Sequence, residues 1–188
     1  MINTILALLA LTIGDGEKTK TVVASAEKSS IVWDAAKVTG THQGNINLSS
    51  GSLDFNGDLL VGGEFTVDMT SINTTDLEGE WKDKLDGHLK SDDFFGVENF
   101  STSKFVITNA KNVSAGSYEI TGDFTIKGIT QSVTFPAKVD SSTSIATAKI
   151  TLDRSKFNIR YGSNSFFDNL GDKAIYDEFT LTIKIVGE

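Results

Sequence analysis

The sequence predicts an all-β protein, built as an antiparallel barrel that one amphipathic helix interrupts. Three observations predict this class. Apolar and polar residues alternate through most of the chain after residue 30, glycine-containing turn signals separate the alternating segments, and a single segment repeats its apolar residues every four positions instead. Alternation with a period of two buries one face of a strand and leaves the other in water, a pattern typical of antiparallel sheets.

The alternating segments follow one another along the chain. The first clear one is GEFTVDMT, in which Phe65, Val67 and Met69 share a face. The same pattern predicts strands in SYEITGDFTIK, QSVTFPAKV, ATAKITLD and EFTLTIKI, and shorter strands are expected over residues 31–39, 43–49, 53–55 and 104–108. Eight to ten strands with short connections indicate a meander that closes as a barrel or folds as a sandwich.

Five dipeptides predict the turns between these strands. Each contains a glycine, which adopts the left-handed backbone conformation of a tight turn without steric cost. They are Ser50-Gly51, Asn56-Gly57, Gly62-Gly63, Ala115-Gly116 and Lys127-Gly128.

The segment TTDLEGEWKDKLDGHLKS predicts the helix, with Asp76 or Thr75 as its N-cap. An apolar stripe about 120° wide needs an apolar partner, so the helix is expected to lie over the barrel mouth with this stripe facing inward. The stripe consists of Leu77, Trp81, Leu85 and Leu89.

His88 lies about 20° from Leu77 on the helical wheel, so it too is expected to face the barrel. Asp92 and Asp93 are interpreted as caps of the next turn, and of the following Phe94 and Phe95 one is expected to plug the core. Two interpretations stay open. Either His88 is a satisfied histidine beside a plug of two phenylalanines, or helix and turn form a lid over an apolar cavity, where His88 meets a ligand head group.

Composition excludes several classes of function. The net charge of −8 and the pI of about 4.8 disfavour binding to nucleic acid, which depends on lysine and arginine. The chain has no cysteine, which excludes disulfides, thiol catalysis and thiolate metal sites. No nucleophile elbow, phosphate-binding loop or dinucleotide fingerprint occurs, so no enzyme activity, catalytic residue or cofactor is predicted.

The first 30 residues are expected to lie outside the barrel domain, which is predicted over residues 31–188. Residues 5–13 form an apolar run too short to span a bilayer, and they resemble the core of a secretory signal with Ala24-Ser25-Ala26 as the cleavage triplet. Residues 14–30 look like a polar linker. Export to the periplasm is the expectation, without a transmembrane anchor; the alternative is a disordered tail on a cytoplasmic protein.

Four motifs, in order, resemble those of the YceI-like family, bacterial lipocalin-like proteins that bind polyisoprenoids. They are GGEFTVDMTSI, KLDGHLKSDDFF, GDFTIKGITQSVTFPAKV and LDRSKFNIRYG. Two further stretches, VTGTHQGNINLSSGSL and NLGDKAIYDEFTLTI, are similar to the branch of the family common in Bacteroidetes. The resemblance covers the chain from about residue 31 to its end.

The resemblance implies an elongated lipocalin-like barrel of about eight antiparallel strands with a helix near its opening. It implies binding, carriage or storage of a polyisoprenoid, isoprenoid quinone or fatty-acid-like chain in a central tunnel, without catalysis. Members are often exported and often dimeric, so a homodimer is included among the expectations. Many members carry an arginine before the aspartate of the helix motif, whereas Leu85 precedes Asp86 in this chain; a head-group role for that arginine therefore does not carry over.

Thirteen residues are predicted to contact the ligand. The tunnel wall is expected to contain Phe65, Val67, Met69, Phe105, Phe124, Ile126 and Phe135. The lid or mouth is expected to contain Trp81, Leu85, His88, Leu89, Phe94 and Phe95. The inward face also has small residues, which either leave room for a chain or merely match the bulky ones: Gly122, Ala137, Ala146 and Ala148.

Two alternatives to a lipid carrier are kept. One is a barrel with a packed core whose surface binds a protein or a glycan. The other is a metal-assisted hydrolase that uses His42 and His88, although the two histidines lack the spacing of a shared helical metal site. For the segment after Asp153, a solvated hairpin with local ion pairs is favoured over an inward-turned Arg154 that pairs with a buried acid or a ligand head.

Overall fold

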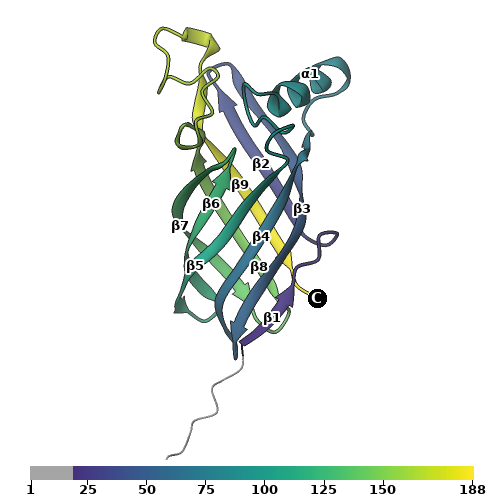
Figure 1. The fold of residues 1–188 in the computed structure, drawn as a ribbon, viewed down its shortest axis with the longest axis vertical. Helices are drawn as coiled ribbons and strands as arrows, with labels where there is room; N and C mark the ends of the chain where they lie inside the picture. The colour runs from purple at the N-terminus through teal and green to yellow at the C-terminus, as the bar shows by residue number, and fades with distance from the viewer. Residues whose placement is uncertain (1–18) are drawn as a thin grey trace, which may run out of the picture.

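The computed structural model describes residues 19–188, which form an eight-position antiparallel barrel with one α-helix (Figure 1). Every neighbouring pair of strands is antiparallel, and β3 pairs with β4 to close the ring. The strands are β1 (Thr19–Val23), β2 (Ser30–Lys37), β3 (Gly40–Asn56), β4 (Leu59–Thr74), β5 (Thr102–Ser114), β6 (Ser117–Ile126), β7 (Ile129–Asp140), β8 (Ile145–Asp153) and β9 (Ile175–Val186). The predicted fold class is confirmed.

The nine strands occupy eight positions around the barrel because β1 and β2 lie end to end along the same side of β3. β2 pairs with the first part of β3 and β1 with the last part. After β1, Ala24 and Ser25 continue the wall, with their backbone N–H groups bonded to Gly51 O and Val186 O. The predicted linker is therefore wrong over Thr19–Val23, because these residues pair with the last part of β3, whereas the stretch TKTVV has no alternation that would identify a strand. The predicted signal core at residues 5–13 lies outside the described residues.

β3 and β4 are longer than predicted. The dipeptides Ser50-Gly51 and Gly62-Gly63 do not form turns but lie inside strands, next to shifts in the β3–β4 register. At Gly51 a side chain would collide with the ring of Phe65, since an added Cβ would lie 2.5 Å from it. Here glycine makes room for an aromatic ring, a use that local turn signals do not reveal.

The other three predicted turns are confirmed. Gly57, Gly116 and Gly128 have φ angles of 58°, 66° and 75°, in the left-handed region. These turns join β3 to β4, β5 to β6 and β6 to β7. The first two lie at the end of the barrel that is drawn at the bottom of Figure 1, called the lower end here.

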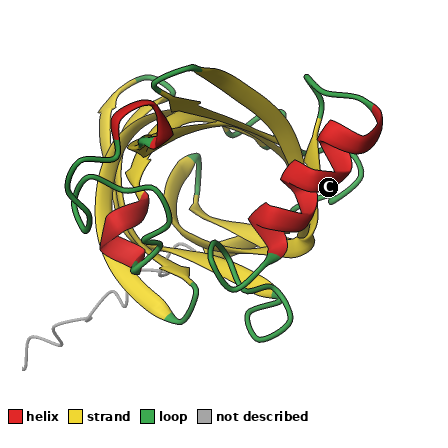
Figure 2. Cartoon of the chain, turned by 90° about the horizontal axis from the view of Figure 1, so that it is seen from above, coloured by secondary structure: helices red, strands yellow, loops and turns green. Residues whose placement is uncertain are grey.

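Helix α1 (Gly79–Lys90) lies at the opposite, upper end, on the rim beside β4 rather than across the ring (Figure 2). None of its residues is fully buried. The predicted caps are wrong: the N-cap is Glu78, without a side-chain bond, and the Asp76 carboxylate instead accepts bonds from Gln43 N and His42. No helix within the described range is long and apolar enough to cross a membrane.

Asp86 attaches the helix to the barrel. Its carboxylate accepts a hydrogen bond of 2.8 Å from Thr74 N, at the end of β4, and pairs with Lys82 one turn earlier on the helix. Burial raises the pKa of Asp86, but the bonds from Lys82 and Thr74 outweigh it, so that the pKa lies below its ordinary value. A residue of the helix motif thus has a structural role here.

The lower end of the barrel is filled by side chains. Tyr118 points inward and its hydroxyl accepts a bond of 3.1 Å from Leu60 N, while Leu53, Phe55 and Val139 are buried around it. The 310-helices η1 (Arg154–Phe157) and η2 (Gly171–Lys173) lie with α1 at the upper end. The barrel interior lies between these two ends.

Candidate functional site: an apolar cavity inside the barrel

An internal cavity of about 190 Å³ lies inside the barrel, and its wall is almost entirely apolar. Side chains from β2 to β9 line it, together with residues from the segments at the upper end. Ten of the thirteen predicted site residues are among them: Phe65, Val67, Met69, Leu89, Phe94, Phe95, Phe105, Phe124, Ile126 and Phe135. The alternating face of each strand is thus the signal that locates the wall.

Four phenylalanines form a connected cluster on one side of the cavity. The ring centroid of Phe105 lies 4.4 Å from that of Phe124, 5.5 Å from that of Phe135 and 6.5 Å from that of Phe65. They come from β4, β5, β6 and β7, so the sheet register places them side by side. Offset and tilted rings at these distances attract one another.

The predicted small residues divide into two groups. Ala137, Ala146 and Ala148 line the cavity, so they leave room as one interpretation expected. Gly122 does not, because the ring of Phe105 occupies the space beside it; an added Cβ would lie 2.4 Å from that ring. The small residues therefore serve both roles that the sequence left open.

Of the residues predicted to form the lid, only some lie at the cavity. Leu89, Phe94 and Phe95 line the upper end of the cavity, but Trp81, Leu85 and His88 do not. The expectation that Trp81 faces the barrel is wrong, since it is 72% exposed and Lys84 lies over its ring. A helical wheel shows which residues share a face, but only the packing of the helix decides where that face points.

His88 faces the loop after β8 rather than the cavity. Its side chain is 33% exposed, and its ring stands edge-on to Tyr161 and Phe94, with centroid distances of 4.3 and 5.1 Å. Asp93 lies 4.0 Å from Nε2. His88 is thus part of an aromatic contact that fastens the loop to the helix, and no side-chain cap bond from Asp92 or Asp93 accompanies it among the described residues.

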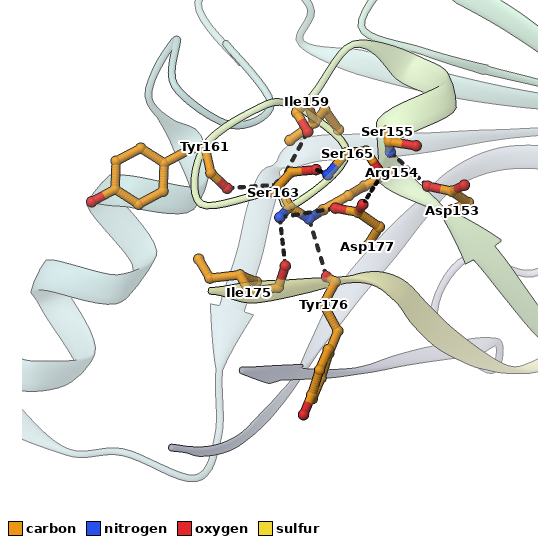
Figure 3. Close-up of polar contacts among 10 residues, drawn as sticks. All are labelled: Asp153, Arg154, Ser155, Ile159, Tyr161, Ser163, Ser165, Ile175, Tyr176 and Asp177. Atoms are coloured by element: carbon orange, nitrogen blue, oxygen red, sulfur yellow. Dashed lines mark hydrogen bonds and ion pairs between the residues drawn. The ribbon is translucent and has the colours of Figure 1, made fainter. Parts of the chain in front are cut away.

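Arg154 is a buried charged residue at the upper end of the cavity (Figure 3), which Lys104 on β5 also lines. It is 4% exposed, and its guanidinium donates to the carbonyl oxygens of Ile159, Tyr161, Ile175 and Tyr176 at 2.8 to 3.2 Å. The favoured solvated hairpin is therefore wrong. The alternative, in which Arg154 turns inward and pairs with a buried acid, is correct, because Asp177 lies 3.2 Å from its Nη2.

The guanidinium of Arg154 has little capacity left for a ligand. A guanidinium has about five N–H donors, and four of them bind carbonyls while Asp177 lies beside the fifth. Burial lowers the pKa of Arg154, and the charges of Asp177 and Asp153 oppose that shift. Arg154 thus holds η1, the following loop and the start of β9 together. Its guanidinium is therefore not a free cation that could bind a ligand in the cavity.

Trp33 is a wall residue that the site prediction missed. It lies on β2, its ring rests against Gly44, and its Nε1 is buried without a hydrogen-bond partner among the described residues. The alternation of Ile31, Trp33 and Ala35 within a predicted strand could have identified it. Because Trp81 is exposed and is the only other tryptophan, Trp33 is a natural fluorescent reporter of the cavity.

The two histidines are engaged separately. His42 Nδ1 lies 2.9 Å from Asp76, whereas His88 lies among aromatic rings. Burial raises the pKa of Asp76, but the bonds from His42 and Gln43 outweigh it, and the pKa is lowered. Within residues 19–188 no three histidine, aspartate or glutamate side chains gather into a group that could hold a metal ion.

Comparison with known protein families gives a match over nearly the whole barrel. The YceI-like domain matches residues 21–187. A UPF0312 protein of Shewanella denitrificans is 33% identical over 94 residues, 50% of this chain and 47% of that protein. A UPF0312 protein of Staphylococcus aureus is 43% identical over 70 residues, 37% of this chain and 34% of that protein. These alignments span half or less of either partner.

Two solved structures share the fold. BcnA of Burkholderia cenocepacia superposes with a TM-score of 0.71 at 19% identity, covering 88% of this chain and 99% of its own. A polyisoprenoid binding domain from Saccharophagus degradans, described as implicated in plant cell wall breakdown, superposes with a TM-score of 0.68 at 12% identity, covering 90% and 99%. At such identities the likeness concerns the fold alone.

Proposed function

Because the chain belongs to the YceI-like family, we propose that it is a non-catalytic lipid-binding protein that holds a long apolar chain, isoprenoid in kind, inside its barrel. The observation that carries the proposal is the apolar cavity, whose wall extends from Leu89 and Phe94 at the upper end to Leu53 and Val139 at the lower end. The similar fold of the Saccharophagus polyisoprenoid binding domain supports the isoprenoid class of ligand.

Burial of the chain would supply the affinity. Each CH₂ group removed from water contributes about 0.8 kcal/mol, so a long chain binds without a strong polar contact. The cavity of about 190 Å³ is smaller than the roughly 300–1,000 Å³ of typical ligand sites. A long isoprenoid therefore requires the cavity to widen, and the cluster of Phe65, Phe105, Phe124 and Phe135 is where rings can change rotamer.

Filling the cavity tests the proposal. In a W81F background, Trp33 is the only tryptophan and its fluorescence reports an occupied cavity. Farnesol should change this emission, and Ala148→Leu should weaken its binding at least tenfold, because the larger side chain occupies the space of the ligand chain.

Thr151→Leu is the matched control. Thr151 lies on the same strand but is exposed, so this variant should bind farnesol like its parent. Native mass spectrometry with organic extraction of the purified protein should also show a stoichiometric prenyl lipid, quinone or fatty-acid-like molecule. Equal farnesol affinity in a folded Ala148→Leu variant would contradict the proposal.

Carriage, storage, export to the periplasm and a homodimer belong to the same proposal. An exported carrier could move an isoprenoid through water between membranes, and a test is the location of the protein after cell fractionation. Ala24 and Ser25, two residues of the predicted cleavage triplet, are buried in the barrel wall. Sequencing the N-terminus of the mature protein shows whether the chain is cut, and where.

A surface-binding function is the second candidate, because aromatic side chains are exposed at the upper end. Trp81 on α1, Phe167 in the loop after η1 and Tyr176 at the start of β9 are the most exposed of them. Such side chains are typical of interaction sites. This candidate predicts binding of a protein or glycan that persists when the cavity is filled by Ala148→Leu.

A further inference from the structure

The barrel wall is interrupted between β7 and β8. Four residue pairs join these strands, from Asp140↔Ile145 to Ala137↔Ala148, all at the lower end. By contrast, ten pairs join β6 to β7 and nine join β8 to β9. Above Ala137 and Ala148 the two strands run without a ladder, until the Gln131 side chain donates to Lys156 O at 3.2 Å. We call this interval the β7–β8 seam.

The only proline of the chain lies at the point where this ladder ends. Pro136 directly precedes Ala137, the last paired residue of β7, and it is exposed. Proline has no backbone N–H, so within sheets it occurs on edge strands, where no neighbour needs that donor. The sequence therefore fits an edge at this position of the barrel wall.

The cavity and an outer groove lie on opposite sides of the wall where the β7–β8 ladder ends. Five residues line both the internal cavity and a shallow groove on the outer face, which extends from β6 across β7, β8 and β9 to the start of β2: Phe135, Ala137, Thr147, Ala148 and Ile183. The β4–β5 ladder is also short, with five pairs, but there the Tyr118 hydroxyl accepts a bond from Leu60 N and fills the space. No comparable side chain bridges the middle of the β7–β8 seam among the described residues.

Three lysines surround the same groove. Lys138 on β7 and Lys184 on β9 both pair with Thr147 of β8, one on each side, and Lys149 lies two residues further along β8. Neighbouring strands are only about 4.8 Å apart, and like charges at such positions repel. Within the described residues none of the three forms an ion pair, and the nearby Glu119 is paired with Lys111.

We propose that this groove, defined by Lys138, Thr147, Lys149 and Lys184, binds the anionic head group of an amphipathic lipid, a phosphate or a carboxylate, while the apolar chain passes through the β7–β8 seam into the cavity. The inference rests on the proposed function and adds the class and place of the head group. It also accounts for a cationic cluster on a protein whose net charge is −8, and for a cavity whose own arginine is already engaged.

A pair of ligands with the same chain tests the head group. In the W81F background, farnesyl phosphate should bind at least tenfold more tightly than farnesol. The variant K138Q/K149Q/K184Q should lose this preference and keep its affinity for farnesol. The control K20Q/K37Q/K173Q removes the same charge from exposed lysines at the lower end and upper rim, and should keep the preference.

Each other outcome decides against the inference. Equal affinity of the parent for both ligands, a preference that survives in the groove variant, or a preference that the control variant loses would each overturn it, and the last would place the head group at the barrel mouth or lower end. Failure of both ligands to bind would overturn the proposed function itself, and the inference with it.

Thiol protection locates the head group independently. Because the chain has no cysteine, a single T147C substitution introduces the only reactive thiol, in the centre of the groove. Farnesyl phosphate should slow its modification at least fivefold, and should not protect T130C, an exposed position on β7 away from the groove. If farnesyl phosphate gives no protection, the inference fails. If inorganic phosphate protects T147C equally well, the groove binds free anions and the lipid head group is excluded.

Discussion

At the scale of single residues, Arg154 contributes most to the upper end of the barrel. It joins segments that are far apart in the sequence, through carbonyls on the loop after η1 and on β9, and it stacks over Phe94 with its Cζ 5.5 Å from the ring centroid. A buried charge is stable only when its donors and its charge are satisfied. Removal of Arg154 would leave Asp177 and the carbonyls without their partner.

Arg154→Met should therefore lower the free energy of unfolding by about 3–5 kcal/mol, the usual effect of breaking a buried ion pair from one side. Chemical denaturation at pH 7 measures it. Arg160→Met is the control, because Arg160 is exposed and its Nε donates to Asn158 only two residues away; a change of less than about 1 kcal/mol is expected. A loss in Arg154→Met as small as in the control would contradict the role of Arg154.

At the scale of elements, α1 is held to the barrel by polar contacts together with the half-buried Leu89, which packs against the core. Asp86 bonds Thr74 N on β4, and no residue of the helix is fully buried. A helix attached in this way responds to pH. The folded pKa of Asp86 lies below its ordinary value, so its stabilising contribution is complete above about pH 4 and is lost as the pH falls through the folded pKa.

Asp86→Asn should accordingly be less stable than the parent at pH 7, by about 0.5–1.5 kcal/mol, and the difference should shrink as the pH falls from 5 to 2.5. Denaturant unfolding across this range measures it. Asp83→Asn is the matched control, since it removes the same charge from the same helix without removing a bond to β4. A difference between parent and Asp86→Asn that stays constant down to pH 2.5 would contradict the assignment.

At the scale of the whole molecule, closure of the ring depends on β1 as well as β2. Val22 is buried in the wall, whereas the adjacent Val23 is 60% exposed. Val22→Asp should therefore lower the free energy of unfolding by at least about 2 kcal/mol, because it places a charge in an apolar site. Val23→Asp makes the same change on the outer face and should have an effect within about 0.5 kcal/mol. Thermal or denaturant unfolding compares them directly, and similar losses in both would mean that β1 does not seal the barrel.

Much of this architecture could be predicted from the sequence because the alternation of apolar and polar residues identifies the two faces of each strand. Phe65, Val67 and Met69, or Phe124 and Ile126, identify the inner face of a strand without any knowledge of its neighbours, and these residues do line the cavity. Turns with a left-handed glycine, as at Gly57 and Gly116, are equally local. The glycines inside β3 and β4 misled because their reason lies on a neighbouring strand: the ring of Phe65 beside Gly51, and the backbone of Ser52 beside Gly63.

The sequence by itself determined the fold class, the family resemblance, the apolar wall and the absence of any cysteine. Only the tertiary structure decided which way α1 turns, that Trp81 faces water, that Arg154 is buried, and that β7 and β8 separate above Ala137 and Ala148. The physical reason is the separation along the chain of the residues that determine each feature. Alternation and turn geometry depend on a few consecutive residues, whereas the docking of a helix, the partners of a buried charge and the end of a strand ladder depend on segments that meet only when the ring closes.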